Sequence, residues 1–541
     1  MPKLFYPDFF NNVFGPIMQP GSSGSFAGTS RVGRIARYTL KSDPKRVRIL
    51  FNPSRHHLLS LGNMMDDRGY LGGLLDFPTD DIRLFSAHEL ARAAKISYEF
   101  GENIADSPYP GAVTFELTGT AGDTATLIAQ SVGGGMVSTY EIHGFPIVWH
   151  ADTYLVLAWG TPENSLPDSI HDTFESTYHT HIVNAGTADR EDGVKAFWWE
   201  LSISPDAVSL AKIFGEQQDW RLWPALLPVV TTSQRRPQLF KTVAEWRQVA
   251  QAKGISFVEA AIEYEKDFSG WDEEKIWDYF ENISKILDHQ IHALEEIGYE
   301  NAKDTAMLPI YGKYWNRYVN TSKPLADPLT AHILVHAFST NAKLPGVPIV
   351  PGPMGTGGGY LYSALDAVRE ERGFSHEKLV EALVVAAALG AIAYTHTNAS
   401  GDVGCVGESG VCCAMASGAV TWLAGGDGIE VENAASMALQ ANLGIPCDPI
   451  PGGLEFPCIT RTLRAAVTAP LYADIALSGI NPLIPYHEVL QAIEKNFRTS
   501  SAGALSGPLC GINCTPTAGK CKVFLQQEVM TDKLRYEAPL E

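Results

Sequence analysis

The sequence predicts an α+β multidomain protein, with an α/β domain at its N-terminus and an all-helical domain at its C-terminus. The chain has 541 residues, of which 45% are hydrophobic and 19% charged. A chain of this length can form roughly two to four domains. Short strand-like apolar runs dominate residues 1–232, whereas long charged segments with helical spacing dominate from Thr242 onward.

Residues 1–150 have the pattern of a compact α/β domain. The runs "RVRILFN", "GAVTFELTG" and "TATLIAQSV" predict strands, and "SAHELARAAKISYEFGENI" predicts a helix. Two stretches rich in glycine, "QPGSSGSFAGTSR" and "SVGGGMV", interrupt the domain. The first precedes the helix-like run "RVGRIARYTL", and a Gly/Ser turn before a helix can bind an anion such as a carboxylate.

Residues 151–232 alternate in another way. The runs "TYLVLAWG", "VKAFWWELSIS" and "WRLWPALLPVV" predict strands, while "SLPDSIHDTFESTYH" and "PDAVSLAKIFGEQ" predict helices. We interpret the pattern as strand–helix–strand–strand–helix–strand, the order of a ferredoxin-like domain.

The remaining chain is predicted to be helical. "VTTSQRRPQLFK" is polar and contains a proline, which is typical of a linker, and residues 240–525 follow as the helical domain with a tail at 526–541. The most apolar window, Ala382–Tyr394, is too short to cross a bilayer at 1.5 Å per residue, so we expect a buried core helix.

The net charge and the positions of the cysteines restrict the partners and the cellular compartment that we expect. The net charge of −20 argues against nucleic acid or an anionic membrane as the main partner, because both attract basic proteins. The N-terminus lacks the pattern of a signal peptide, and no cysteine precedes Cys405. In a secreted protein, disulfide bonds would be expected along the whole chain. Because the cysteines here begin only at Cys405, we predict a reduced, cytoplasmic protein.

Three cysteines form the most informative motif. Cys405, Cys447 and Cys458 lie in segments rich in glycine and proline, with 41 and 10 residues between them. They are compatible with three buried thiols, or with zinc, although no C-x2–4-C pair surrounds them. They also suit an iron–sulfur cluster, because loop segments leave backbone N–H groups free to bond cluster sulfurs. Three thiolates leave one iron of a four-iron cluster open as a Lewis acid.

Two segments carry a specific resemblance. "GCVGESGVCCAMASG" and "NLGIPCDPIPGGLEFPCITR" resemble the cluster-binding segments of the iron–sulfur-dependent L-serine dehydratases. The resemblance implies that Cys405, Cys447 and Cys458 hold a [4Fe–4S] cluster whose free iron takes the leaving hydroxyl group. "PGSSGSFAGTSRVGRIAR" resembles a motif of the family's small N-terminal domain, and residues 151–232 resemble an ACT-type regulatory domain. The order matches the single-chain form of the family and implies a homodimer.

The sequence departs from the family at the expected active site. The family motif Ser-Ser-Ser-His-Thr-x-Gly-Pro-x-Arg aligns from Ser22, so that its histidine is replaced by Ser25. A second family histidine, in Gly-His-Gly-Thr-Asp, is matched by Tyr70. A family Ser-Ser pair that holds the substrate carboxylate is matched by Gly357 and Gly358. The substrate-binding residues implied by the resemblance are Ser22, Ser23, Gly24, Gly357, Gly358 and Asn398.

These replacements remove volume, so we expect a pocket for a hydroxylated amino or carboxylic acid bulkier than serine. Tyr70 is the positional candidate for the base at the carbon next to the carboxylate, and Ser25 for a hydrogen-bond donor. A tyrosine needs a lowered pKa for this role. Further candidates are His56, His57, His396 and Glu408, the last as a group that orients ligands.

The predicted function is a [4Fe–4S]-dependent lyase that eliminates water, followed by release of ammonia if the substrate is an amino acid. Two alternatives remain open. An open iron also allows a desulfidase reaction with sulfide as the leaving group, and an inactive homologue with a structural cluster would be an amino-acid sensor. The roles of Cys510, Cys514 and Cys521 are open.

Overall fold

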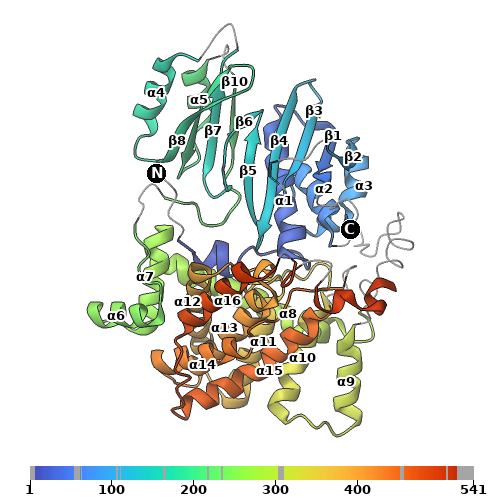
Figure 1. Ribbon diagram of the computed structural model, residues 1–541, viewed down its shortest axis with the longest axis vertical. Coiled ribbons are helices and arrows are strands. Elements are labelled where there is room, and N and C mark those ends of the chain that lie inside the picture. The colour runs from blue at the N-terminus through green and yellow to red at the C-terminus, as the bar shows by residue number, and fades with distance from the viewer. Residues whose placement is uncertain are drawn as a thin grey trace. The chain divides into compact units, whose positions relative to one another are not determined.

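The computed structural model divides the chain into two compact units (Figure 1). The structure describes residues 6–53, 61–62, 64–104, 108–109, 111–161, 166–215, 219–232, 236–302, 310–450, 456–501, 503–506 and 510–520. Residues 24–236 form the sheet unit, which contains two β-sheets, and residues 6–23 with 237–520 form the helical unit. The prediction of a mixed N-terminal half and a helical C-terminal half is confirmed.

A six-stranded sheet with the order β2-β1-β3-β4-β5-β6 forms the first part of the sheet unit. Its strands are β1 (Pro44–Phe51), β2 (Ser97–Glu102), β3 (Val113–Gly119), β4 (Thr124–Gly133), β5 (Met136–Ile142) and β6 (Phe145–Pro146). Strands β1 and β2 are parallel, and the other neighbours are antiparallel. The parallel pair requires a long crossover, which contains α2 (Asp66–Leu74) and α3 (Ala87–Ala93).

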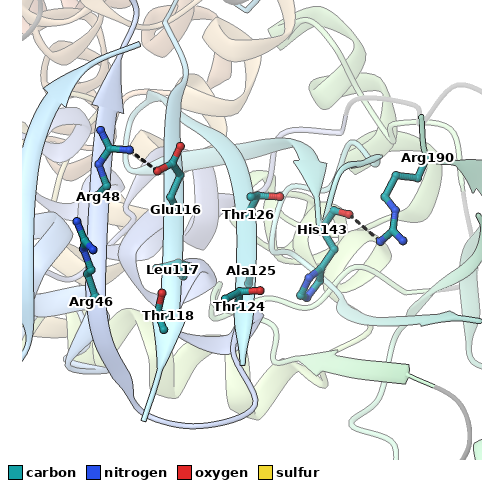
Figure 2. Close-up of a pocket in the computed structure, with 10 residues that line it drawn as sticks. All are labelled: Arg46, Arg48, Glu116, Leu117, Thr118, Thr124, Ala125, Thr126, His143 and Arg190. Atoms are coloured by element: carbon teal, nitrogen blue, oxygen red, sulfur yellow. Dashed lines mark hydrogen bonds and ion pairs between the residues drawn. The ribbon is translucent and has the colours of Figure 1, made fainter. Parts of the chain in front are cut away.

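One face of this sheet carries polar side chains around a groove of about 570 Å³ (Figure 2). Because side chains alternate along a strand, Arg46 and Arg48 of β1 share this face while Val47 points to the other. Arg48 donates to Glu116 of β3 over 2.6 Å. None of the residues predicted for the active site lines this groove.

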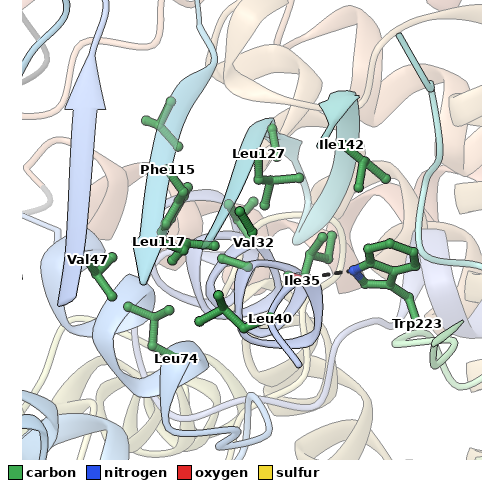
Figure 3. Packing of buried hydrophobic residues seen from close by; sticks show 14 of the residues in the cluster. Val32, Ile35, Leu40, Val47, Leu74, Phe115, Leu117, Leu127, Ile142 and Trp223 are labelled. Atoms are coloured by element: carbon green, nitrogen blue, oxygen red, sulfur yellow. Dashed lines mark hydrogen bonds between the residues drawn. The ribbon is translucent and has the colours of Figure 1, made fainter. Parts of the chain in front are cut away.

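The opposite face of the sheet holds the core of the unit (Figure 3). Val32 and Ile35 of α1 (Thr29–Thr39) pack there with apolar residues of the strands. Trp223, from the second sheet, is fully buried in the same cluster and donates its indole N–H to the carbonyl oxygen of Ile35 over 3.2 Å. The predicted 1–150 and 151–232 regions therefore share one core.

The second sheet has four antiparallel strands in the order β10-β7-β9-β8. Its elements are β7 (Tyr154–Trp159), α4 (Asp168–Tyr178), β8 (Ile182–Asp189), β9 (Lys195–Leu201), α5 (Ala207–Phe214) and β10 (Asp219–Trp223). This confirms the predicted strand–helix–strand–strand–helix–strand order. Phe174 of α4 stacks on Trp199 of β9 at 4.1 Å between ring centroids, which fixes the helix on one face of the sheet.

The helical unit is built from packed helices (Figure 1). They are α6 (Val243–Lys253), α7 (Phe257–Ser269), α8 (Glu273–Ile297), α9 (Tyr311–Thr321), α10 (Pro328–Ala342), α11 (Gly357–Arg372), α12 (His376–His396), α13 (Ser409–Leu423), α14 (Gly428–Gln440), α15 (Cys458–Leu477) and α16 (Tyr486–Thr499). Several begin at side-chain caps, such as Asp272, whose carboxylate accepts from the N–H of Lys275 over 2.8 Å.

The N-terminal segment belongs to the helical unit, whereas the sequence analysis placed it in the α/β domain of residues 1–150. The π-helical turn η1 (Phe9–Val13) is fully buried, and Phe9 stacks on Tyr264 of α7 at 5.3 Å. Its N–H also donates to the Glu265 carboxylate over 2.8 Å. The segment is rich in aromatic residues. Burial of their apolar surface among the helices stabilises this position, although the neighbouring residues in the sequence belong to the sheet unit.

Helix α12 contains the predicted apolar window and is longer than expected. It spans 21 residues, or about 31 Å, so it is long and apolar enough to cross a membrane. However, 78% of its most apolar 18-residue window is buried inside the unit. The predicted buried core helix is thus confirmed by its burial, whereas the length argument was wrong.

Candidate functional site

Cys405 lies in a short 3₁₀ turn, η7 (Cys405–Gly407), directly before α13. Its side chain is 1% exposed, and its Sγ lies 3.0 Å from Oγ of Ser409 in the first turn of that helix. Gly404 precedes it with φ of +99°, and a Cβ at this position would lie 2.6 Å from the carbonyl oxygen of Ile445. Only glycine permits this close approach, which brings the Cys405 turn against the segment that leads to Cys447.

Cys447 lies beside the same turn. Its N–H donates to the carbonyl oxygen of Leu505 over 2.7 Å, which ties the segment to the C-terminal part of the unit. A Cβ at Gly401 would lie 2.8 Å from Sγ of Cys447 and 3.5 Å from Oε2 of Glu408. Because Gly401 has no side chain, it leaves space for the Cys447 thiol and the Glu408 carboxylate, which come from different segments.

Cys458 is the first residue of α15, which packs on α13. One turn later, Arg461 donates through Nη1 to the carbonyl oxygen of Pro446 and to Oδ1 of Asp448, both over 2.6 Å. The guanidinium also interacts with the thiol of Cys405. Arg461 thus links the three segments that carry the predicted ligands, and we call this group of residues the cysteine site: Cys405, Glu408, Cys447, Asp448, Cys458 and Arg461.

Burial favours the protonated form of two thiols in the cysteine site. It raises the pKa of Cys405 and of Cys447, and the negative charge of Glu408 adds to both rises. Arg461 acts in the opposite direction on Cys405. The thiols of Cys405 and Cys447 therefore keep their protons without a cation, and a bound metal centre would have to displace these protons, since metals take thiolates as ligands.

Asp448 was not predicted, although it adjoins Cys447 in the sequence. Its side chain is 1% exposed, and its two oxygens bind Arg461 and the N–H of Ile512, the latter over 2.7 Å. This second bond fixes the turn η8 (Gly511–Cys514). Cys510 donates its thiol to the carbonyl oxygen of Cys447 over 3.3 Å, so it lies beside the site, while Cys514 is exposed. Cys521 lies outside the described residues.

Gly357 and Gly358 begin α11, and their surroundings leave no room for side chains. A Cβ would lie 2.4 Å from the carbonyl oxygen of Gly352 at Gly357, and 2.4 Å from that of Val350 at Gly358. The volume that the sequence suggested was freed by these glycines is occupied by backbone of the same unit. The argument for a larger pocket at these two positions was therefore wrong.

Replacing Gly358 by alanine is expected to lower the free energy of unfolding by about 1–3 kcal/mol, the usual cost of forcing extra volume into a packed core. Chemical denaturation measures this loss. Gly519→Ala is the matched control, because a Cβ there meets nothing within 4 Å. Equal stability of the two variants would contradict the packing described for α11.

Two other candidates near Cys405 have local partners. Asn398 is exposed and donates to Oδ2 of Asp402 over 3.3 Å. A ring nitrogen of His396 lies 2.8 Å from the carbonyl oxygen of Lys241, and burial lowers its pKa. His396 is held by the backbone of its own unit, as expected of a structural histidine.

The serine-rich motif is divided between the two units. Ser22 and Ser23 belong to the helical unit, and Gly24 and Ser25 to the sheet unit. The carbonyl oxygen of Gly24 accepts from the hydroxyl of Ser131 over 2.7 Å, and that of Ser25 accepts from Thr29 at the start of α1 over 2.7 Å. Residues Ser23–Gly28 form the π-helical segment η2, which runs directly into α1, so the predicted Gly/Ser turn before the helix is itself helical.

Tyr70 lies on α2 and is 6% exposed. Its ring makes edge contacts with Phe51 and Phe115, at 6.2 and 5.7 Å between centroids. Burial, followed by the negative charge of Asp66, raises the pKa of Tyr70, which is opposite to what a tyrosine base requires. His56 and His57 lie outside the described residues.

Asp66, one turn before Tyr70, is a functional candidate that the sequence did not indicate. Burial and the neighbouring carboxylate of Asp67 raise the pKa of Asp66 to about 7. Its Oδ1 accepts from the N–H of Gly62 over 2.8 Å. A carboxyl group with a pKa near neutrality can accept or release a proton at physiological pH, which an ordinary aspartate cannot do.

Comparison with known proteins places residues 252–506 in the family model described as serine dehydratase alpha chain. The chain is 28% identical over 285 residues to the probable L-serine dehydratase alpha chain of Bacillus subtilis, covering 52% of this chain and 93% of that protein. It is 26% identical over 284 residues to the L-serine dehydratase alpha chain of Peptoniphilus asaccharolyticus, covering 50% and 96%. It is 30% identical over 249 residues to an L-serine dehydratase of Streptomyces coelicolor, covering 44% and 53%. Cys405, Cys447 and Cys458 all fall inside the matched region.

Proposed function

The chain belongs to the serine dehydratase family through residues 252–506, and we propose that it is a carbon–oxygen lyase that removes water from a hydroxylated amino or carboxylic acid. The observation that carries this proposal is the cysteine site within the family region. With an amino acid as substrate, loss of water leaves an enamine, which hydrolyses to a keto acid and ammonia.

We propose that Cys405, Cys447 and Cys458 hold a [4Fe–4S] cluster. The donor set fits this group, because cluster irons are bound by thiolates and Arg461 places a positive charge beside the Cys405 thiol. When bound, the cluster would supply a Lewis acid for the leaving hydroxyl group. Glu408 acts on both Cys405 and Cys447, so it would orient these ligands and tune their basicity.

For the proton on the carbon next to the carboxylate, we propose Asp66 as the base, with Tyr70 as a neutral hydroxyl group beside the substrate. The pKa of about 7 at Asp66 suits a base, whereas the raised pKa of Tyr70 keeps its proton in place. The proposed contacts for the substrate remain those whose motifs resemble motifs of the family: Ser22, Ser23, Gly24, Ser25 and Asn398. The backbone of Gly357 and Gly358 can contribute N–H donors but no side chain.

This assignment predicts the pH profile of turnover. Asp66 acts as a base only when deprotonated, so kcat should rise as the pH increases through about 7. Asp66→Asn should lose this rise and most of the activity, whereas Tyr70→Phe should lower kcat and keep the midpoint. Release of keto acid and ammonia measures both. An unchanged pH profile in Asp66→Asn would remove Asp66 from the mechanism.

The same assay discriminates between substrates and alternative functions. Serine, threonine and larger β-hydroxy amino acids should be compared, because the proposal of a substrate bulkier than serine now rests on Ser25 alone. Release of sulfide from cysteine would favour the desulfidase reaction. Ligand binding with an intact cluster and no turnover would favour a sensor. We further propose a cytoplasmic homodimer and an ACT-like role for the four-stranded sheet, which light scattering and amino-acid titration can test.

A further inference from the structure

A second group of metal-ligating side chains lies in the helical unit, on helices that do not carry the cysteines. It consists of His292 on α8, His336 on α10 and Asp366 on α11. One ligand atom of each residue lies within 4.8 Å of those of the other two. Three helices thus bring two imidazoles and a carboxylate to one point.

Two of these ligand atoms are buried without a hydrogen-bond partner. His336 is 3% exposed and Asp366 is fully buried, yet Nδ1 of His336 and Oδ2 of Asp366 bond to no other described atom. The two atoms lie 3.9 Å apart, too far for a hydrogen bond. Buried polar atoms are almost always satisfied, so two that face each other indicate that something binds between them.

The surrounding contacts orient the three side chains as ligands. A nitrogen of His292, Nδ1, lies 2.9 Å from the carbonyl oxygen of Asp288, which fixes the proton on Nδ1 and leaves the lone pair on Nε2. His336 also interacts with the backbone of Ser363, and its Nδ1 has no hydrogen-bond partner among the described atoms. Histidines that bind metals usually donate their second nitrogen to a carbonyl or carboxylate in this way.

Asp366 is held by a similar arrangement. Nε of Arg369 donates to its Oδ1 over 2.8 Å, and Oδ2 remains available. The guanidinium places a positive charge near the site. Asp288 and Glu370 provide further carboxylates nearby, the first within 3.6 Å of His292 and the second within 3.5 Å of His332. The burial that lowers the pKa of His336 to about 3 also keeps this imidazole neutral, the form that binds metals.

We propose that His292, His336 and Asp366 bind a first-row divalent metal ion, most suitably Zn²⁺, independently of the cysteine site and of the proposed function. Two imidazoles and one carboxylate form a ligand set used for such ions, whereas Mg²⁺ and Ca²⁺ prefer oxygen ligands. Ligands of a tetrahedral zinc ion lie about 3.4 Å apart, so the helices need to close by only a few tenths of an ångström at the His336–Asp366 pair. The ion would cross-link α8, α10 and α11.

The test measures metal binding and not activity. Purified wild type, Asp366→Asn and His336→Gln are dialysed against Zn²⁺ and analysed for bound metal. His332→Gln is the matched control, because His332 lies on the same helix with its ring 4.5 Å from that of His336 but outside the ligand set. The cysteines contribute equally in all four proteins. We expect the two ligand variants to bind one ion fewer than wild type and the control to bind the same number.

A second measurement keeps the test valid if a ligand variant fails to fold. Co²⁺ bound to a chain that carries Cys405→Ser, Cys447→Ser and Cys458→Ser should give visible absorption bands of nitrogen and oxygen ligation without thiolate charge-transfer bands. The bound ion should also raise the melting temperature of wild type and of His332→Gln, since a ligand that binds only the folded state stabilises it. Equal metal content in all four proteins, or no Co²⁺ spectrum in the triple serine variant, would overturn the proposal.

Discussion

Cys405→Ser is expected to reduce turnover to background while the protein remains folded. The change replaces one sulfur by oxygen at a side chain that is 1% exposed, so packing is nearly preserved and the contact with Ser409 can persist. A serine hydroxyl does not replace a thiolate as a ligand of iron, so the proposed cluster would lose one of its three protein ligands. Keto-acid release measures turnover, and circular dichroism measures folding.

The matched control is Cys413→Ser. Cys413 is also a fully buried cysteine at the start of α13, but its Sγ contacts Thr468 at 3.6 Å and the backbone of Ala465 at 3.8 Å. It is outside the cysteine site, so its variant should keep most of the activity. Normal turnover in Cys405→Ser, or equal losses in both variants, would show that Cys405 contributes packing only.

Asp448→Ala is expected to lower the free energy of unfolding by about 3–5 kcal/mol, the cost of breaking a buried ion pair by removing one partner. The variant leaves Arg461, whose side chain is only 16% exposed, without its carboxylate, and it releases the N–H of Ile512. It should also loosen the turn that holds Cys510. Denaturant unfolding measures the stability, and hydrogen exchange over residues 510–514 measures the local effect.

An exposed pair provides the comparison for Asp448. Arg498 donates to Glu494 over 2.7 Å, but the arginine side chain is 74% exposed. Arg498→Ala should therefore cost less than about 1 kcal/mol, because surface ion pairs contribute little. A similarly small effect of Asp448→Ala would mean that Arg461 finds solvent or another partner, and that Asp448 does not organise the cysteine site.

The sequence predicted those helices and strands in which the spacing of apolar residues matches the side chains that the structure buries. The four strands and two helices of the second sheet follow from apolar runs separated by turn residues. The helical half follows from long amphipathic segments such as α8. Neither inference needs knowledge of distant contacts, since each element carries its own pattern.

Features that depend on distant contacts were not predicted. The turn at Phe9–Val13 packs against α7, more than 240 residues later, and its sequence contains no sign of that partner. Gly357 and Gly358 suggested free volume, whereas the structure places carbonyl oxygens of Gly352 and Val350 there. A glycine in the sequence shows that a side chain is absent, but the structure is needed to show which atoms occupy that space.

The residues of the candidate site likewise divide into those that the sequence predicted and those that depend on distant contacts. The cysteines could be selected because their residue type and spacing have a chemical meaning in the sequence. Asp448 and Arg461 could not be selected, since charged residues close to a cysteine in sequence are common. Only the 2.6 Å contact between the two side chains gives them a role. The raised pKa values of Tyr70 and Asp66 depend on burial, which the sequence does not show.

The central claim is that Cys405, Cys447 and Cys458 hold an iron–sulfur cluster, and the most direct test is iron and sulfide analysis with EPR after anaerobic purification of wild type and Cys447→Ser. We predict about four irons and four sulfides per wild-type chain, with most of both lost in the variant. Zinc in place of iron, or no metal bound to these cysteines, would contradict the claim and leave the three thiols with a structural role.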